Sequence, residues 1–168
     1  LLDNRPERIA IDTEGTGLEW IRGHYPFLLQ ISYKEGESLC IPLCRVFWPE
    51  YTDEEYTKIM AQVKDLLEDE TVKKVLHNSK FDMHMLRNIG INVRGVDHDT
   101  ILLAYVVDEN MQSKSLDDCV IRWVPEMAGY SNELQTQYNK SRMMDIPRDI
   151  LLRYSGGDSD ATLRLFNK

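Results

Sequence analysis

Two acidic residues at the end of a short apolar stretch are the first candidates for chemistry. Residues 9–11, Ile-Ala-Ile, predict a buried strand, and side chains two residues apart in a strand point to the same side. Asp12 and Glu14 therefore place two like charges side by side, directly before the turn GTGL. A bound divalent cation would make this repulsion tolerable. Similar pairs, such as Glu35 and Glu37, are expected to be solvated surface charge, so a polar strand end remains an equal alternative.

The segment HNSKFDMHML contains a third acidic candidate, Asp82. Ser79 predicts a helix N-cap, and Asp82 then occupies the N3 position of a capping box, where a negative charge also interacts favourably with the helix dipole. In this interpretation Asn78 is a turn residue. The alternative is that Asp82 joins Asp12 and Glu14 in one site. The segment by itself favours capping.

Asp158 is the fourth candidate and lies in the segment YSGGDSDATLRL. Tyr154 and Asp158 are four residues apart, so they share a helical face. Apolar residues lie on the same face, namely Ile150, Leu151, Ala161 and Leu165. A carboxylate on an inward face is costly unless it is hydrogen-bonded or binds a metal. We favour a functional role, with a buried Tyr–Asp hydrogen bond or an acid that reaches water at the helix edge as alternatives.

Four carboxylates from three distant segments could meet at one end of a sheet. Mg²⁺ and Mn²⁺ prefer such hard oxygen ligands, and two ions about 3.5–4 Å apart can stabilise both the attacking and the leaving oxygen of a phosphodiester. Two divalent ions would balance four negative charges. The sequence therefore predicts a site for two Mg²⁺ or Mn²⁺ ions, with Asp12, Glu14, Asp82 and Asp158 as ligands.

Hydrophobic periodicity predicts the elements that position these residues. Strands are predicted at residues 8–12, 27–36, 38–43 and 72–77, the second and third forming a hairpin. Helices are predicted at residues 52–69, 79–90, 99–107 and 115–123, and a last one from Pro147 to the C-terminus. Residues 125–145 read as polar and irregular. This order predicts an α/β domain with a mixed central sheet flanked by helices. Its first three strands would be antiparallel, and strand 72–77 would be parallel to the first.

Composition limits the class of protein. The 168 residues suit one domain, no apolar run has membrane-spanning length, and we expect a monomer. Three cysteines cannot all pair, which indicates reduced thiols in a cytosolic protein. The net charge of −8 argues against a nucleic-acid partner, unless metal ions held by carboxylates reverse the local charge.

The three motifs in this order resemble the DEDD exonuclease superfamily, in the subclass with tyrosine in the third motif. The closest likeness is to the 3′–5′ proofreading domain of family A DNA polymerases of the phage type. DTEGTGL resembles the first motif, HNSKFDMHML the second and YSGGDSDATLRL the third. The segments GVDHDTILLAYVVDE and SLDDCV also resemble family segments, so the likeness covers residues 9–165. It departs from the family at Gly156 and Gly157, and in the absence of a following polymerase portion.

The resemblance implies an RNase H-like fold and a role for each site residue. Asp12, Glu14 and Asp158 would hold the first metal, and Asp12 would bridge to a second that Asp82 supports. Tyr154 would orient the attacking water. Two substrate contacts are also implied, Leu18 as an apolar wedge against the terminal base and Asn78 near the substrate.

The function implied is hydrolysis from the 3′ end of single-stranded or frayed DNA, releasing nucleoside 5′-monophosphates during proofreading. A polymerase domain would act with it in cis or in trans, so residues 1–168 would be one exonuclease domain cut from a longer chain. We expect it in the cytoplasm of a bacterial or phage-infected cell, with no membrane partner. An RNase D-like exoribonuclease and an inactive nucleic-acid-binding or scaffolding module are the alternatives. An HD-type phosphohydrolase built on His77, His84 and residues 97–99 is disfavoured, because that chemistry belongs to all-helical domains.

Further residues carry weaker expectations. Four basic residues and two tyrosines flank the motifs and either hold the DNA strand or are ordinary surface, namely Lys80, Lys140, Arg142, Arg148, Tyr130 and Tyr138. A helical wheel places Gly156 towards solvent and Gly157 beside Tyr154. On that basis Gly156→Ala would stabilise the domain and spare activity, whereas Gly157→Ala would cost activity.

Overall fold

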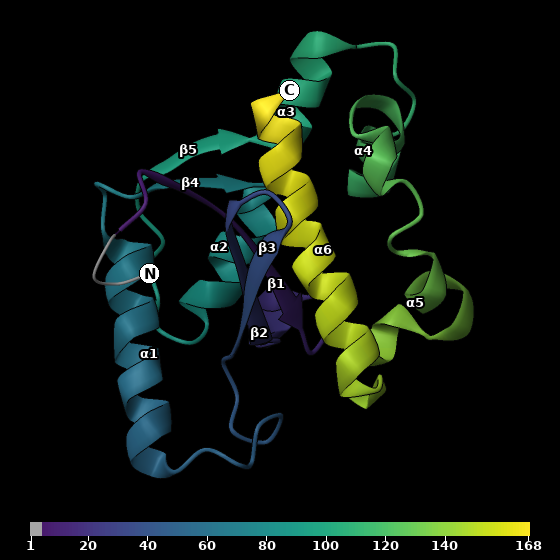
Figure 1. The fold of residues 1–168 in the computed structure, drawn as a ribbon. Helices are drawn as coiled ribbons and strands as arrows, with labels where there is room; N and C mark the ends of the chain where they lie inside the picture. Colours follow the sequence, from purple (N-terminus) through teal and green to yellow (C-terminus); the bar gives the residue numbers. More distant parts are fainter. Residues whose placement is uncertain (1–4) are drawn as a thin grey trace.

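The computed structural model describes residues 5–168 and contains a five-stranded mixed sheet with helices on both faces (Figure 1). The strands are β1 (Arg8–Gly15), β2 (Pro26–Lys34), β3 (Glu37–Pro42), β4 (Lys73–Leu76) and β5 (Val96–Asp99). They are ordered β3-β2-β1-β4-β5. The β1–β2 and β2–β3 pairs are antiparallel, and β4 is parallel to β1, which confirms the predicted fold class and topology.

One strand was not predicted. β5 runs parallel to β4 and consists of Val-Asp-His-Asp, which has too few apolar residues to produce an alternating pattern. It ends at Asp99, which caps the following helix as expected.

The six α-helices agree with the predicted ones, with one addition. They are α1 (Asp53–Glu68), α2 (Ser79–Arg87), α3 (Thr100–Val107), α4 (Leu116–Trp123), α5 (Asn132–Gln137) and α6 (Arg148–Asn167). α1 begins with the predicted capping box of Thr52 and Glu55. The interpretation of residues 125–145 as irregular is wrong, because the segment contains α5 and the 3₁₀ turns Pro125–Met127 and Lys140–Asp145. These are too short to give a clear periodic signal.

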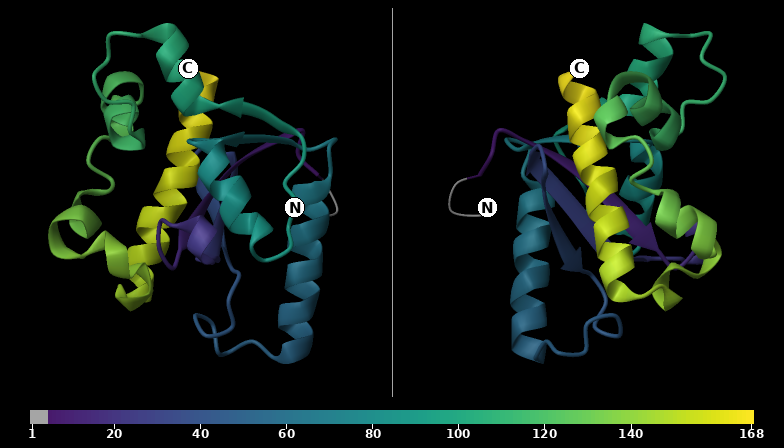
Figure 2. Two further views of the ribbon diagram at one scale, coloured as in Figure 1. Left: turned by 180° about the vertical axis from the view of Figure 1, so that it is seen from behind. Right: turned by 45° about the vertical axis from the view of Figure 1, so that its right-hand side comes forward.

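The sheet lies between two helical layers, as the views in Figure 2 make clear. α1 and α2 cover one face, where Ile9 and Ile11 of β1 pack against Leu66 and Leu86. α6 crosses the other face and packs with β2 and the 125–145 segment, through Leu28, Leu134 and Leu151. No helix among residues 5–168 is both long and apolar enough to cross a membrane.

The contact between α6 and the sheet is formed by small polar residues. Ser38 of β3 donates a hydrogen bond from Oγ to the Gly156 carbonyl (2.6 Å), and Ser159 lies 2.9 Å from Ser32, oxygen to oxygen. Gly156 is therefore buried against β3, and its predicted position towards solvent is wrong. The physical reason is that α6 packs on the sheet on one side and on α4 and α5 on another, so little of its middle faces water.

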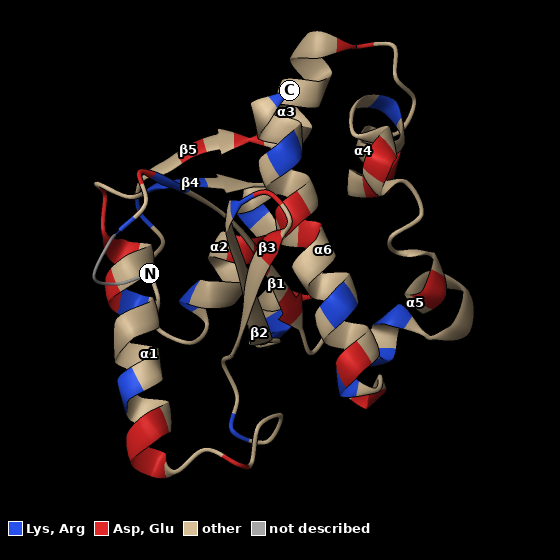
Figure 3. Cartoon of the chain, viewed as in Figure 1, with Lys and Arg blue, Asp and Glu red and all other residues tan. Residues whose placement is uncertain are grey.

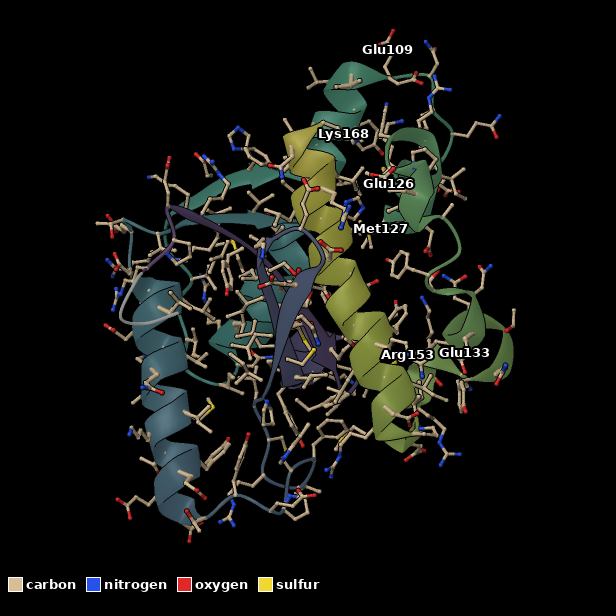
Figure 4. The ribbon with its side chains drawn as sticks, viewed as in Figure 1. Glu109, Glu126, Met127, Glu133, Arg153 and Lys168 are labelled. Atoms are coloured by element: carbon tan, nitrogen blue, oxygen red, sulfur yellow. The ribbon has the colours of Figure 1, made fainter. Side chains whose placement is uncertain are left out.

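The 125–145 segment is tied to α6 by charged pairs. Arg153 of α6 lies 3.4 Å from Glu133 of α5, nitrogen to oxygen, and Glu126 lies 3.9 Å from Lys168 (Figure 4). Surface ion pairs contribute little stability individually. Here they join the first half of the segment to the helix that carries Asp158.

Candidate active site

Three of the four predicted acids meet between β1 and α6. Asp12 and Glu14 alternate with Ile9 and Ile11 along β1, so they face α6 while the isoleucines face the opposite layer. One oxygen each from Asp12, Glu14 and Asp158 lie within 4.8 Å of one another. Glu14 is 8% exposed and Asp158 7%, so both carboxylates lie largely out of water.

Asp82 does not form the capping box that its segment suggested. It is 2% exposed and accepts a hydrogen bond from Thr13 Oγ1 at 2.6 Å. The start of α2 is instead capped by Asp99, whose carboxylate accepts from the backbone N–H groups of Asn78 (2.9 Å) and Ser79 (2.7 Å). Asp82 thus faces β1, and after burial its charge is the largest cause that raises the pKa of Asp12.

Hydroxyl groups support the carboxylates, and sequence reasoning missed most of them. Ser155 donates to Glu14 Oε1 at 2.7 Å, Thr13 donates to Asp82, and the Tyr130 hydroxyl donates to Asp158 Oδ1. Hydroxyl donors orient a carboxylate without neutralising its charge. Thr13 and Ser155 adjoin motif residues, which is the signal that could have identified them.

The four acids share an electrostatic environment that disfavours their ionised forms. Burial is the largest cause for each, and it raises the pKa of Glu14 to about 8 and those of Asp82 and Asp158 to about 7. The pKa of Asp12 is raised well above its usual value, first by burial and then by repulsion from Asp82, Asp158 and Glu14. A bound cation would stabilise the ionised carboxylates and so lower these pKa values.

Tyr154 lies four residues before Asp158 in α6 and has two aromatic or cationic neighbours. The Lys140 ammonium lies 3.0 Å from the Tyr154 hydroxyl oxygen and 4.9 Å from its ring centroid. The Tyr130 ring stacks with the Tyr154 ring, with 6.4 Å between centroids and 16° between planes. The positive charge of Lys140 also lowers the pKa of Glu14 and Asp158, although burial outweighs it.

The predicted substrate contacts lie at the surface around this cluster. Leu18 follows β1 and is 82% exposed. Asn78 is exposed at the start of α2, in a left-handed conformation with φ of 70°.

Several other candidates have structural partners. Arg142 pairs with Asp145, and Arg148 pairs with Glu50 at 2.8 Å. Tyr138 packs against the apolar cluster of β2 and α6. His77 contacts Thr100 Oγ1 (2.8 Å) and the Lys114 carbonyl (3.0 Å) and is therefore a structural residue, which leaves no basis for an HD-type site.

The donor set fits a hard divalent cation. Each acid of the Asp12, Glu14 and Asp158 cluster offers a carboxylate oxygen, and neither thiol nor imidazole ligands contribute to this cluster. Oxygen-only coordination is typical of Mg²⁺ and Mn²⁺ rather than Zn²⁺.

Comparison with known proteins assigns the chain to a family. A 3′–5′ exonuclease family model found in family A DNA polymerases matches residues 2–168. DNA polymerase I of Pseudomonas aeruginosa is 30% identical over 166 residues, covering 95% of this chain. The DNA polymerase of Escherichia phage T5 is 28% identical over 178 residues, again covering 95%. The chain spans only 18% and 19% of these two relatives, respectively.

Solved structures agree on the fold. Brucella melitensis NrnC superposes with a TM-score of 0.72 at 20% identity, covering 99% of this chain and 73% of NrnC. The catalytic core of RRP6 from Trypanosoma brucei superposes with a TM-score of 0.67 at 19% identity, covering 99% of this chain and 41% of that one. At this identity the likeness concerns the fold, which is RNase H-like. With the family match over nearly its full length, the chain belongs to the 3′–5′ exonuclease domain family of family A DNA polymerases and is a nuclease.

Proposed function

We propose that the domain hydrolyses the terminal phosphodiester at the 3′ end of single-stranded or frayed DNA and releases nucleoside 5′-monophosphates. The observation that carries the proposal is the convergence of Asp12, Glu14 and Asp158, with one oxygen each within 4.8 Å, in a chain of the exonuclease family. Two divalent ions, Mg²⁺ or Mn²⁺, would be held by these acids.

Each site residue has a proposed role. Asp12, Glu14 and Asp158 hold the first ion, and Asp12 shares the second with Asp82. When bound, such ions lower the pKa of water and stabilise the attacking and leaving oxygens. Tyr154 orients the water, and Lys140 fixes the Tyr154 hydroxyl by donating a hydrogen bond to it. At the substrate, Leu18 packs against the terminal base and Asn78 contacts the strand.

The biological setting is part of the proposal. The sequence relatives are DNA polymerases several times longer than this chain, which favours DNA as the substrate and proofreading during replication as the role. Residues 1–168 would form a single monomeric exonuclease domain that acts with a polymerase domain in cis or in trans. It would work in the cytoplasm of a bacterial or phage-infected cell.

The test compares labelled DNA and RNA oligonucleotides of equal sequence, with the label at the 5′ end. We expect a descending ladder with DNA in Mg²⁺ or Mn²⁺, release of 5′-monophosphates, and no products in EDTA. Asp158→Ala should abolish the ladder, whereas Tyr154→Phe should retain more activity than Asp158→Ala because it removes no metal ligand.

Three outcomes of this test would contradict the proposal, and two of them would indicate another function. Faster cleavage of RNA would indicate an exoribonuclease. Strand binding without products in any metal would indicate a binding or scaffolding module. Activity that persists in EDTA would contradict the metal site.

A further inference from the structure

Tyr130 occupies a position in the site that its sequence segment does not explain. It lies outside the three motifs, yet its hydroxyl donates a hydrogen bond to Asp158 Oδ1, 28 residues away. The ring stacks on Tyr154 and is half-buried. The phenol therefore reaches the carboxylate from the 125–145 segment, whereas Asp158 itself belongs to α6.

The segment around Tyr130 is firmly held. Its neighbour Ser131 is 3% exposed and donates to Asp117 Oδ1 at 2.5 Å. Glu126, which precedes Tyr130, pairs with Arg164 of α6 at 3.9 Å. Glu133, which follows it, pairs with Arg153 of α6 at 3.4 Å (Figure 4). A phenol fixed in this way can set the rotation of the carboxylate it contacts.

Gly157 makes this approach possible. A Cβ atom at Gly157 would lie 2.5 Å from Cδ2 and 2.8 Å from Cε2 of Tyr130, closer than real side chains approach. Any larger residue there would displace the ring and draw its hydroxyl away from Asp158. The closeness of the Tyr130 ring therefore explains why residue 157 has no side chain.

We propose that Tyr130 is a positioning residue that holds one oxygen of Asp158, so that the other faces the oxygens of Asp12 and Glu14, and that Gly157 provides the space it needs. Hydrogen-bond partners of metal ligands typically change metal affinity by about 10–100-fold when removed. The inference rests on the proposed metal site at Asp158, and it concerns the hydroxyl of Tyr130 rather than its ring.

The direct test measures Mn²⁺ binding by calorimetry, without nucleic acid. Tyr130→Phe keeps the ring and removes only the hydroxyl, so we expect about 10–100-fold weaker Mn²⁺ binding with a normal circular dichroism spectrum. Tyr33→Phe is the matched control, because Tyr33 is exposed near the C-terminal end of β2. This variant should bind Mn²⁺ like the wild type.

A double-mutant cycle tests the role of Gly157. Gly157→Ala alone should weaken Mn²⁺ binding, but it should cause little further loss in the Tyr130→Phe background, since the hydroxyl is already gone. Fully additive losses would overturn the proposed link between the two residues.

Kinetics distinguish positioning from contact with the base. For Tyr130→Phe we expect kcat to fall at limiting Mn²⁺ and to recover at saturating Mn²⁺, with an unchanged KM for DNA. A raised KM with normal Mn²⁺ affinity would overturn the inference and leave the proposed metal site intact. Failure of the wild type to bind Mn²⁺ would instead contradict the proposed metal site itself, and the inference with it.

Discussion

At the residue scale, the site combines buried negative charge with neutral hydrogen-bond donors. Asp82, Glu14 and Asp158 each accept a bond from a hydroxyl, supplied by Thr13, Ser155 and Tyr130 respectively. The Lys140 ammonium contacts the Tyr154 hydroxyl, and its charge partly offsets the rise in the pKa values of Glu14 and Asp158 that burial causes. The carboxylates are thus held in place while their charge remains available for metal ions.

This arrangement predicts an unusual dependence of stability on pH. The four acids have folded-state pKa values above their usual values, so between about pH 4 and 8 the folded protein binds more protons than the unfolded chain. In EDTA, the free energy of unfolding should therefore fall as the pH rises through this interval. Urea denaturation at pH 5 and pH 8 measures it.

Asp12→Asn provides the internal comparison for that prediction. It removes one charge at nearly constant shape, so it should stabilise the protein in EDTA more at pH 8 than at pH 5, while abolishing turnover. Equal effects at both pH values would show that charge repulsion does not destabilise the site.

At the element scale, α6 joins the sheet to the helices that support Asp158. It carries Tyr154 and Asp158, packs on β1, β2 and β3, and contacts α4 and α5. Its close approach to the sheet depends on Gly156 and on serines of β2 and β3.

The close approach predicts that Gly156→Ala destabilises the domain, contrary to the expectation from the helical wheel. A Cβ there would lie 3.3 Å from Ser38 Cβ, closer than most Cβ contacts, and Ser38 is held in β3 by its hydrogen bond to the Gly156 carbonyl. Overpacking costs about 1–3 kcal/mol, and the helix-propensity gain of about 1 kcal/mol offsets part of it. We expect a net loss of about 1 kcal/mol in urea denaturation.

The control for Gly156→Ala removes the opposing atom. In a Ser38→Gly background the contact disappears, so the same substitution should become neutral or stabilising. A stabilising Gly156→Ala in the wild-type background would mean that β3 shifts freely.

At the scale of the whole molecule, the charge distribution is unusual for a nuclease. The net charge is −8, and Lys and Arg are scattered over several elements rather than gathered on one (Figure 3). Arg142, Arg148 and Arg153 are engaged in ion pairs. Attraction of the DNA strand should therefore depend mainly on the bound metal ions and on few lysines, such as Lys140 and Lys80.

This distribution predicts a weak dependence of activity on monovalent salt. Each phosphate contact with a single strand contributes a slope of about −0.7 to a plot of log affinity against log salt concentration. With about two such contacts, log kcat/KM at fixed Mg²⁺ should fall with KCl at a slope of about −1.4. A slope of about −4 or steeper would instead indicate that an extended basic surface contacts the strand.

The sequence by itself determined the fold class and the pairing of the first four strands, and it predicted the acids of the site. These depend on local patterns: an apolar strand that ends in Asp12 and Glu14, a capping box at Thr52, and Tyr154 four residues before Asp158. Local periodicity indicates which residues face inward. The topology then follows because only a few ways of connecting such elements are allowed.

Tertiary structure alone decided which side chains support those acids. Thr13 and Asp82 are 69 residues apart, Tyr130 and Asp158 are 28 apart, and Ser38 and Gly156 are 118 apart. A helical wheel cannot reveal that α6 is covered on opposite sides, and a capping pattern at Ser79 cannot reveal that Asp99 already caps α2. Such contacts depend on how separate elements pack, which periodicity within one element does not encode.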